Sequence, residues 1–242
     1  MSDYDSRLVQ LYDDDNTDGP DRDFFRTLAE ENRARTIVDL GCGTGLLTVS
    51  FCKPGRSVFG IDPSRSMLDH ARARPGAESV TWILGDSSVI PQVDGDLVVM
   101  SANVAQLISG KAWRRALADI YQALRPGGLL AFDRRNPAAR EWEGWTKDKS
   151  YGTRSTTVGE LTEWMEAGPV SPSGDVSVNF HNVFTATDDH VVEHQTFSFL
   201  DEEEVSRDLK TAGFDDVGVW GGWNHEPTTN ASPLMVFEAR KN

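Results

Sequence analysis

Short apolar runs rich in Val and Ile recur along the centre of the chain, with helical segments between them. The runs predict strands at Thr36–Gly41, Ser57–Asp62, Val80–Gly85, Asp96–Ser101 and Gly128–Asp133. The segments between them predict helices near Gly45–Cys52, Ser64–Ala73 and Lys111–Leu124. Strands that alternate with helices in this way form βαβ units, which build a parallel sheet. The pattern therefore predicts an α/β fold.

The pattern changes after Asp133. Residues 134–172 contain many polar residues and several tryptophans, and they show little periodicity. Two runs of alternating apolar and polar residues follow, at Val176–Thr185 and Val191–Leu200. Alternation with a period of two is typical of half-buried strands. We therefore expect a β-hairpin inserted into the α/β unit.

The last part of the chain returns to the earlier pattern. Asp201 and Glu204 stand at the spacing of a capping box, which predicts that a helix begins at this point. Two further apolar runs, Val217–Trp223 and Leu234–Arg240, predict the final strands.

Length and charge narrow the possible functions. A chain of 242 residues is long enough for one α/β domain with an inserted region. Its net charge of −14 would repel a phosphate backbone, which argues against nucleic acid as a partner. There is no apolar run of membrane-spanning length, and the N-terminus is acidic, unlike a signal peptide. We therefore expect no membrane association and a cytoplasmic location.

The chain contains two cysteines, Cys42 and Cys52. No histidine lies near them at metal-ligand spacing, so neither a metal site nor a disulfide scaffold is expected. Both are interpreted as small buried thiols.

A glycine-rich loop lies between the first predicted strand and the following helix. Gly41, Gly43 and Gly45 let the backbone turn tightly and approach a ligand, and the free N–H groups of a helix start favour an electron-rich group. The next strand ends in Asp62, where this topology places an acceptor carboxylate beside a ribose. Leu46 occupies the third glycine position of a dinucleotide fingerprint, which disfavours a pyrophosphate. Together these features predict a nucleoside cofactor without phosphates.

Five motifs occur one after another along the chain: VDLGCGTG, GIDPSRSMLDHAR, LGDSS, LRPGGLLAF and the terminal AGF…VFEARK. In these motifs the sequence resembles class I S-adenosylmethionine-dependent methyltransferases, especially their small-molecule branch, from about Thr36 to Arg240. The resemblance implies a Rossmann-like, doubly wound sheet of seven strands whose last strand, Leu234–Arg240, is antiparallel. It also implies S-adenosylmethionine as the cofactor.

Three regions follow from this resemblance. Residues 36–133 and 201–242 would form the Rossmann-like domain that binds S-adenosylmethionine. Residues 134–200 would form an inserted lid that contains the hairpin, and residues 1–35 a helical segment that covers the cofactor site.

The resemblance also assigns roles at the cofactor site. The methionine moiety would be held by Asp39 and by the backbone of Gly41, Cys42, Gly43 and Gly45. Asp62 would accept hydrogen bonds from the ribose hydroxyls, because a carboxylate is a strong acceptor. The adenine would lie between Ile61 and Pro63, and its edge would be recognised by Asp86 and the amide of Ser87.

Four further residues are candidates for this site. Ser101 and Ala102, at the end of the fourth strand, would line the methionine end. Asn103 follows at the edge of the sheet where ligands bind in open α/β folds, and Tyr12 comes from the N-terminal segment. Asp39 and Asp86 also have purely structural explanations, because Asp39 could cap a turn and Asp86 could begin an Asx turn before Ser87.

Methyl transfer from a sulfonium is an in-line displacement. The donor already carries an activated methyl group, so the protein can act mainly by alignment and exclusion of water, and a general base is optional. The candidate bases are His181 and His194, on the two runs of the hairpin. Their alternation with apolar neighbours leaves open whether they face a pocket or water. His225, before the last strand, is a third histidine that could reach the site.

The lid is the expected binding region for the acceptor. Trp142, Trp145, Trp164 and Tyr151 suit an aromatic or amphipathic ligand, and they equally suit a hydrophobic cluster that holds the hairpin in place. The leading interpretation is methyl transfer to oxygen or nitrogen of a small molecule by a monomer or weak homodimer. The alternatives are a nicotinamide-dependent oxidoreductase and a module that binds S-adenosylmethionine without turnover.

Overall fold

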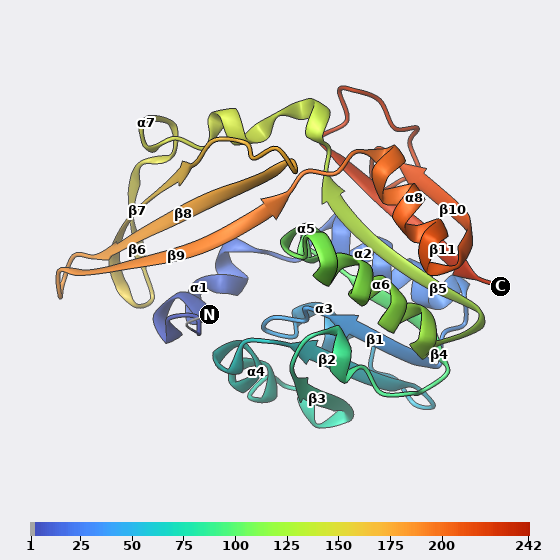
Figure 1. The fold of residues 1–242 in the computed structure, drawn as a ribbon. Coiled ribbons are helices and arrows are strands. Elements are labelled where there is room, and N and C mark those ends of the chain that lie inside the picture. Colours follow the sequence, from blue (N-terminus) through green and yellow to red (C-terminus); the bar gives the residue numbers. More distant parts are fainter. Residues whose placement is uncertain (1–2) are drawn as a thin grey trace.

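Residues 3–242 are described by a computed structural model of the protein, so residues 1 and 2 of the expected N-terminal segment lie outside the described residues. This part of the chain contains two β-sheets (Figure 1). The larger has seven strands in the order β10-β11-β5-β4-β1-β2-β3, and the smaller has four in the order β6-β7-β8-β9.

The strands of the larger sheet are β1 Thr36–Leu40, β2 Ser57–Asp62, β3 Val80–Leu84, β4 Gly95–Met100, β5 Leu124–Arg135, β10 Phe214–Trp220 and β11 Leu234–Lys241. Strands β1 to β5 pair in parallel, whereas β11 is antiparallel to both of its neighbours. The predicted Rossmann-like sheet with an antiparallel last strand is therefore confirmed. The strand boundaries differ from the predicted ones by up to a few residues.

The helices are α1 Ser6–Asp15, α2 Pro20–Glu31, α3 Leu46–Ser50, α4 Arg65–Arg72, α5 Val104–Leu107, α6 Gly110–Ala123, α7 Lys147–Ser150 and α8 Glu202–Ala212. Short 3-10 turns lie at Ala77–Ser79, Ser87–Val89, Pro137–Ala139 and Glu141–Gly144. The predicted capping box is present at the start of α8, where Asp201 Oδ1 accepts from the Glu204 backbone N–H at 2.8 Å. None of the helices within residues 3–242 is long and apolar enough to cross a bilayer.

Helices cover both faces of the larger sheet. On one face, Trp113 and Leu117 of α6 and Leu209 of α8 pack into a fully buried cluster. On the other, Phe25 of α2 and Leu47 of α3 pack against strand residues in a second cluster. Burial of both faces explains why the central strands are continuous apolar runs and lack a simple alternation.

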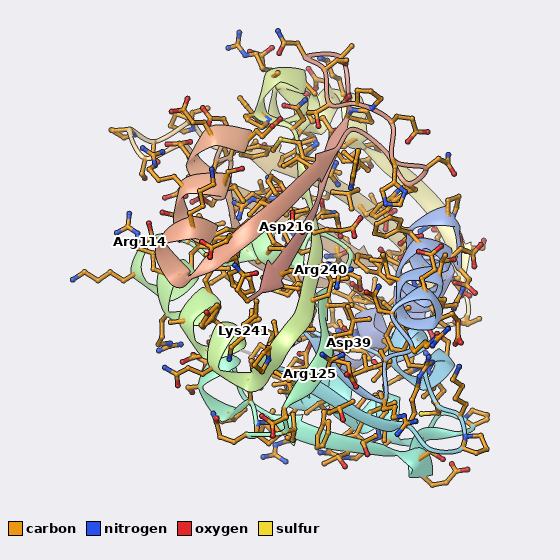
Figure 2. All side chains as sticks on the ribbon, turned by 90° about the vertical axis from the view of Figure 1, so that its right-hand side faces the viewer. Asp39, Arg114, Arg125, Asp216, Arg240 and Lys241 are labelled. Atoms are coloured by element: carbon orange, nitrogen blue, oxygen red, sulfur yellow. The ribbon has the colours of Figure 1, made fainter. Side chains whose placement is uncertain are left out.

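The end of the chain is fixed to the edge of the domain that lies far from the glycine loop. Figure 2 shows Arg125, Arg240 and Lys241 on this side of the molecule. Lys241 Nζ donates to the carbonyl oxygens of Tyr121 and Leu124, each at 2.7 Å, and Arg240 Nη2 donates to Asn32 Oδ1 at 2.8 Å. These cations satisfy groups of the protein itself and do not form an open basic surface.

The smaller sheet is larger than the predicted hairpin. Strands β8 Asp175–Phe184 and β9 Asp189–Ser198 form that hairpin, and the preceding segment adds β6 Gly152–Thr156 and β7 Gly159–Ala167. The expectation of an inserted hairpin is correct, but the interpretation of residues 134–172 as lacking periodic structure is wrong. In β7, Glu163 is paired with Asn182 of β8, so that two polar residues lie at corresponding positions of the sheet and hide its alternation.

Helix α1 lies between the smaller sheet and α4 (Figure 1). Leu11 of α1 is buried against Leu161 and Phe184 of the smaller sheet. The guanidinium of Arg7 lies 3.8 Å from the ring centre of Phe184 and donates to Asp189 at 2.8 Å. The N-terminal segment therefore connects the lid to the main domain.

Candidate active site

The glycine loop is built from backbone conformations that favour glycine. Gly41, Gly43 and Gly45 have φ angles of +78°, +52° and +77°. A Cβ atom at Gly41 would lie 2.4 Å from Val104, and one at Gly45 would lie 2.5 Å from Trp82. Any other residue at these two positions would be strained and would clash, so the sequence folds here into a tight, closely packed turn.

Asp62, at the end of β2, holds this loop in place. Its Oδ2 accepts from the backbone N–H of Gly43 and its Oδ1 accepts from that of Ser64, both at 2.8 Å. Burial raises the pKa of Asp62, although the two hydrogen bonds act in the opposite direction. A carboxylate has about four acceptor positions, so Asp62 can still accept from ribose hydroxyls.

Asp39, at the end of β1, is only 1% exposed. Its Oδ2 accepts from Thr48 Oγ1 at 2.6 Å, whereas its Oδ1 has no partner within the described chain. Burial raises the pKa of Asp39 to about 7. The hydrogen bond to a side chain does not match the alternative that Asp39 caps a turn. An unpartnered buried carboxylate oxygen beside the glycine loop suits a cationic group of a ligand.

Asp86 does begin an Asx turn. Its Oδ1 accepts from the backbone N–H of Ser88 at 2.9 Å and from Ser88 Oγ at 2.6 Å. Ser87 is buried, and its Oγ donates to Asp119 Oδ2 at 2.7 Å. These contacts explain Asp86 and Ser87 structurally, so their roles at the adenine remain predictions.

The residues expected beside the adenine differ in exposure. The Ile61 side chain is 0% exposed within the core, and its backbone carbonyl accepts from the N–H groups of Gly41 and Cys42 at 2.7 and 3.0 Å. Pro63 is exposed. Cys42 and Cys52 are both free thiols, and Cys42 is buried.

The turn after β4 contains Ser101, Ala102 and Asn103. Ala102 and Asn103 have φ angles of +56° and +63°, which are uncommon for residues with a side chain. The Asn103 backbone N–H donates to Asp133 Oδ2 at 3.0 Å. Such strain persists only where neighbouring groups hold it, and it concentrates at functional sites.

Asp133, near the end of β5, was not predicted as a site residue. It is 3% exposed, and its Oδ1 has no partner among residues 3–242. Burial raises the pKa of Asp133 to about 7. The sequence signal for it is a lone acidic residue at the carboxyl end of an apolar strand, in LLAFD.

The N-terminal segment contacts the glycine loop directly. Asp13 accepts from Thr44 Oγ1 at 2.6 Å and pairs with Arg74. Tyr12 lies next to Gly43, where an added Cβ would be 3.9 Å from Tyr12 Cε1. Arg22, which is 7% exposed, acts electrostatically on both Asp39 and Tyr12 and lowers the pKa of each, against the larger effect of burial.

A cavity of about 590 Å³ lies between α1, the turn after β4 and the smaller sheet, and none of the residues Gly41–Gly45 belongs to its wall. Tyr12, Ala102 and Asn103 form the part of its wall nearest the loop. Phe180 and Glu193 of the smaller sheet form part of the opposite wall. The volume is within the range of about 300–1,000 Å³ typical of small-molecule sites.

The two candidate catalytic histidines lie on the other face of the smaller sheet. The register pairs His181 with Val192 and Asn179 with His194, while Phe180 is paired with Glu193. Because side chains alternate along a strand, the histidines point away from the face that carries Phe180 and Glu193.

Contacts on that outer face hold both histidines. His181 forms part of the cavity wall, but its ring stacks on Trp164 at 4.6 Å and its Nδ1 lies 3.0 Å from His190 Nε2. His194 Nδ1 lies 2.7 Å from Asn179 Oδ1, and His194 is not part of the wall. Their role as bases therefore remains only a prediction.

The remaining aromatic candidates mainly support the fold. Trp142 and Trp145 pack with Phe199 in a cluster within the lid. Tyr151 is 57% exposed. His225 Nε2 lies 2.8 Å from Glu238 Oε1 and is not part of the cavity wall.

Glu193 is the functional candidate that sequence reasoning missed. It lies on β9 between Val192 and His194 and faces the cavity. Burial raises the pKa of Glu193 to about 7, and the charge of Asp5 adds to this effect. In the sequence, Glu193 differs from an ordinary surface glutamate only in that its side chain points inward in the alternation of β9. Which residues of β9 point inward is known only once the strand register is known.

Comparisons with known proteins agree with this geometry. Residues 37–128 match a family described as methyltransferase domain. A malonyl-[acyl-carrier protein] O-methyltransferase of Yersinia pestis is 32% identical over 106 residues, which cover 43% of this chain and 38% of the relative. The match therefore spans less than half of the length of either protein.

Solved structures resemble the chain over nearly its whole length. The CcbJ methyltransferase of Streptomyces caelestis has a TM-score of 0.77 at 18% identity, and the match covers 94% of this chain and 98% of that one. The sugar N-methyltransferase KedS8 of Streptoalloteichus sp. has a TM-score of 0.73 at 16% identity, with 100% and 95% covered.

The fold and the glycine loop are those of class I S-adenosylmethionine-dependent methyltransferases. Residues 37–128 match the methyltransferase domain family, which confirms the resemblance found in the sequence for this part of the chain.

Proposed function

We propose that the protein transfers a methyl group from S-adenosylmethionine to a nitrogen or oxygen atom of a small molecule bound in the cavity. One observation carries this proposal: Tyr12 lies beside Gly43, Ala102 and Asn103 directly precede Val104, which packs against Gly41, and all three residues line the cavity. A methyl donor bound at the loop would thus lie next to an acceptor bound in the cavity.

The residues around the loop fit this donor. When bound, S-adenosylmethionine supplies a methyl group on a positively charged sulfur with a neutral leaving group. Asp62 has acceptor positions for the ribose, and Asp39 offers its unpartnered Oδ1 to the cationic methionine end. Asp86 would recognise the adenine edge through Oδ2, which its Asx turn does not use and which also pairs with Arg115.

The lid and α1 would align the acceptor and exclude water. Tyr4 and Tyr12 cover the cavity from the N-terminal side, and Phe180 covers it from the smaller sheet. Enclosure converts the reaction of two bound molecules into an effectively unimolecular step, which can account for a large part of the rate enhancement. Alignment of this kind supports in-line displacement without requiring a metal ion.

The names of two similar proteins support both oxygen and nitrogen as the atom that accepts the methyl group. The Yersinia pestis relative is named for O-methylation of malonyl-[acyl-carrier protein], and KedS8 is named for N-methylation of a sugar. The acidic character of this chain supports a small molecule and argues against nucleic acid.

Titration calorimetry with S-adenosylmethionine and with NAD tests the proposal. We expect the methyl donor to bind and NAD not to bind. Asp62→Asn should weaken donor binding by about tenfold or more, because hydrogen bonds to a charged acceptor contribute about 1.5–3 kcal/mol. Asp69→Asn, on the exposed side of α4, is the matched control and should leave the affinity unchanged.

Two outcomes would contradict the proposal. Binding of NAD without binding of S-adenosylmethionine would indicate an oxidoreductase. Donor binding without transfer of the labelled methyl group to any member of a panel of small amines and alcohols would indicate a binding module.

A further inference from the structure

The Glu193 carboxylate is the feature of the cavity that the cofactor site does not use. Glu193 is half-buried on β9, opposite Phe180 of β8, and belongs to the cavity wall. Within residues 3–242 its carboxylate has no hydrogen bond of at most 3.5 Å and no ion pair of at most 4.0 Å. A carboxylate that has lost part of its hydration without gaining a partner is costly, and a ligand can offset that cost.

The cations that border the cavity are already paired with other carboxylates. Arg154 donates to Asp15 at 2.8 Å and to Glu163 at 3.2 Å. Arg135 pairs with Glu141. Because these partners neutralise both guanidinium groups, Glu193 is left with an uncompensated negative charge in the cavity.

Two phenols, Tyr4 and Tyr12, belong to the same cavity wall as Glu193, and Tyr12 lies beside Gly43 of the cofactor loop. Tyr4 accepts a hydrogen bond from Gln195 Nε2 at 2.9 Å. Burial raises the pKa of Tyr4, and the charges of Glu193 and Asp62 and the neighbouring Tyr12 add to this effect. Gln195 lies two residues from Glu193 on the same face of β9, so its bond to Tyr4 joins the Glu193 side of the wall to the N-terminal segment, whose Tyr12 lies beside Gly43.

We propose that Glu193 binds the ammonium group of the acceptor and takes its proton, so that the acceptor of this enzyme is a small cationic amine. This inference rests on the proposed methyl transfer and specifies its substrate class. The aromatic walls support it, since Tyr4, Tyr12 and Phe180 can stabilise a cation through their ring faces.

Methyl transfer to the amine requires one proton transfer and one displacement. The ammonium proton moves to a Glu193 oxygen, which leaves a neutral amine with a free electron pair. That pair forms the new bond from nitrogen to the methyl carbon of the sulfonium donor, while the carbon–sulfur bond breaks and its electrons remain on sulfur. The product is a methylated ammonium ion, and Glu193 returns its proton to water when the site opens.

The surroundings of Glu193 suit this proton transfer. Burial and the charge of Asp5 raise its pKa to about 7, so the carboxyl can both accept and release a proton near neutral pH. The other charged or titratable groups around the cavity are Tyr4, Tyr12, Asp15, Arg135, Arg154, Glu163 and His181. A neutral hydroxyl compound would leave the carboxylate without a cation, and it would be far too weak an acid for Glu193 to deprotonate.

The test compares phenethylamine and cyclohexylamine with phenethyl alcohol and cyclohexanol. Binding to the full-length protein is measured by protein-detected NMR titration with S-adenosylhomocysteine present, so turnover is not needed. We expect each amine to bind at least about tenfold more tightly than its alcohol, a difference of about 1.4 kcal/mol. Glu193→Gln should remove this preference and leave the weak alcohol binding unchanged.

Glu160→Gln is the matched control, because Glu160 lies exposed on β7 of the same sheet and is not part of the cavity wall. It should retain the preference for amines. In the wild type the amine affinity should fall as the pH is lowered through about 7, because protonation of Glu193 removes the ion pair. In Glu193→Gln the amine affinity should not change over this range.

The results separate this inference from the proposed function. Equal binding of amines and alcohols, no detectable amine binding at millimolar concentration, or full amine binding by Glu193→Gln would overturn the role of Glu193. Donor affinity is measured in parallel and should be the same in Glu193→Gln as in the wild type. Failure of the wild type to bind S-adenosylmethionine would instead overturn the proposed function.

Discussion

The guanidinium of Arg134 donates to the carbonyl oxygen of Ser198 at 2.6 Å, at the point where the lid returns to the main domain. A second bond from the same group reaches the carbonyl oxygen of Ala105 at 3.0 Å. Arg134 is 0% exposed, and burial lowers its pKa to about 10, so it stays charged at neutral pH. One buried cation therefore joins β5, the end of the lid and the short helix beside Asn103.

Arg134→Met should destabilise the protein by about 3 kcal/mol, because two charge-assisted hydrogen bonds are lost in a buried site. Urea denaturation measures the change. Arg140→Met is the control, since the Arg140 side chain is 64% exposed and its ion pair with Glu143 is at the surface. A loss below about 1 kcal/mol for Arg134→Met would contradict the importance of this connection.

Gly45→Ala should lower the free energy of unfolding by more than the positive φ angle of this position alone explains. Gly45 and Gly55 have similar φ angles of +77° and +81°, but a Cβ at Gly45 would lie 2.5 Å from Trp82, whereas one at Gly55 has no neighbour within 4 Å. Gly55→Ala therefore measures the conformational penalty, about 1 kcal/mol. The excess loss in Gly45→Ala, measured in the same urea experiment, reports the clash with Trp82, and equal losses would show that the loop can shift.

The buried carboxyl of Asp133 should make stability depend on pH. Its folded pKa of about 7 lies above the ordinary value of about 3.9. Between these values the folded state holds a proton that the unfolded state releases, so the contribution of Asp133 to the free energy of unfolding falls as the pH rises. Asp133→Asn, which can still accept from the Asn103 N–H, should gain stability relative to the wild type from pH 5 to 8.

The size of this gain is on the order of a few kcal/mol, since one pKa unit corresponds to about 1.4 kcal/mol. Thermal unfolding across the pH series measures it. Asp69→Asn, at the surface of α4, is the control and should show no such trend relative to the wild type. A constant difference between Asp133→Asn and the wild type at all pH values would mean that Asp133 titrates normally.

His181→Ala and His194→Ala test the bases suggested by the sequence. Since both side chains lie on the outer face of the lid sheet, we expect each variant to retain the amine preference of the wild type. The NMR titration described for Glu193→Gln provides the measurement. Loss of amine binding in His194→Ala, with a normal spectrum of the folded protein, would show that the lid sheet presents its other face to the acceptor.

Much of the cofactor region could be predicted from the sequence because its signals are local. The glycines of the loop need their own positive φ angles, and Asp62 ends a strand that is recognisable from its apolar residues. The lid was harder to predict. Glu163 and Glu193 are inward residues of strands that line a cavity, so polarity there no longer marks the solvent face.

The orientation of the histidines and of Glu193 depends on strand register. A shift of one residue exchanges the two faces of a strand, and no single run of sequence fixes that register. It is set by pairing across four strands and by contacts with α1, such as Leu11 against Leu161. Asp133 was missed for a related reason, because its burial depends on elements distant in the sequence that pack together around the end of β5.

Helix α1 contacts the lid through Arg7 and Leu11, and the glycine loop through Asp13 and Tyr12. A single displacement of this helix would uncover the donor compartment and the acceptor compartment together. The demethylated cofactor and the methylated product would then leave through the same opening.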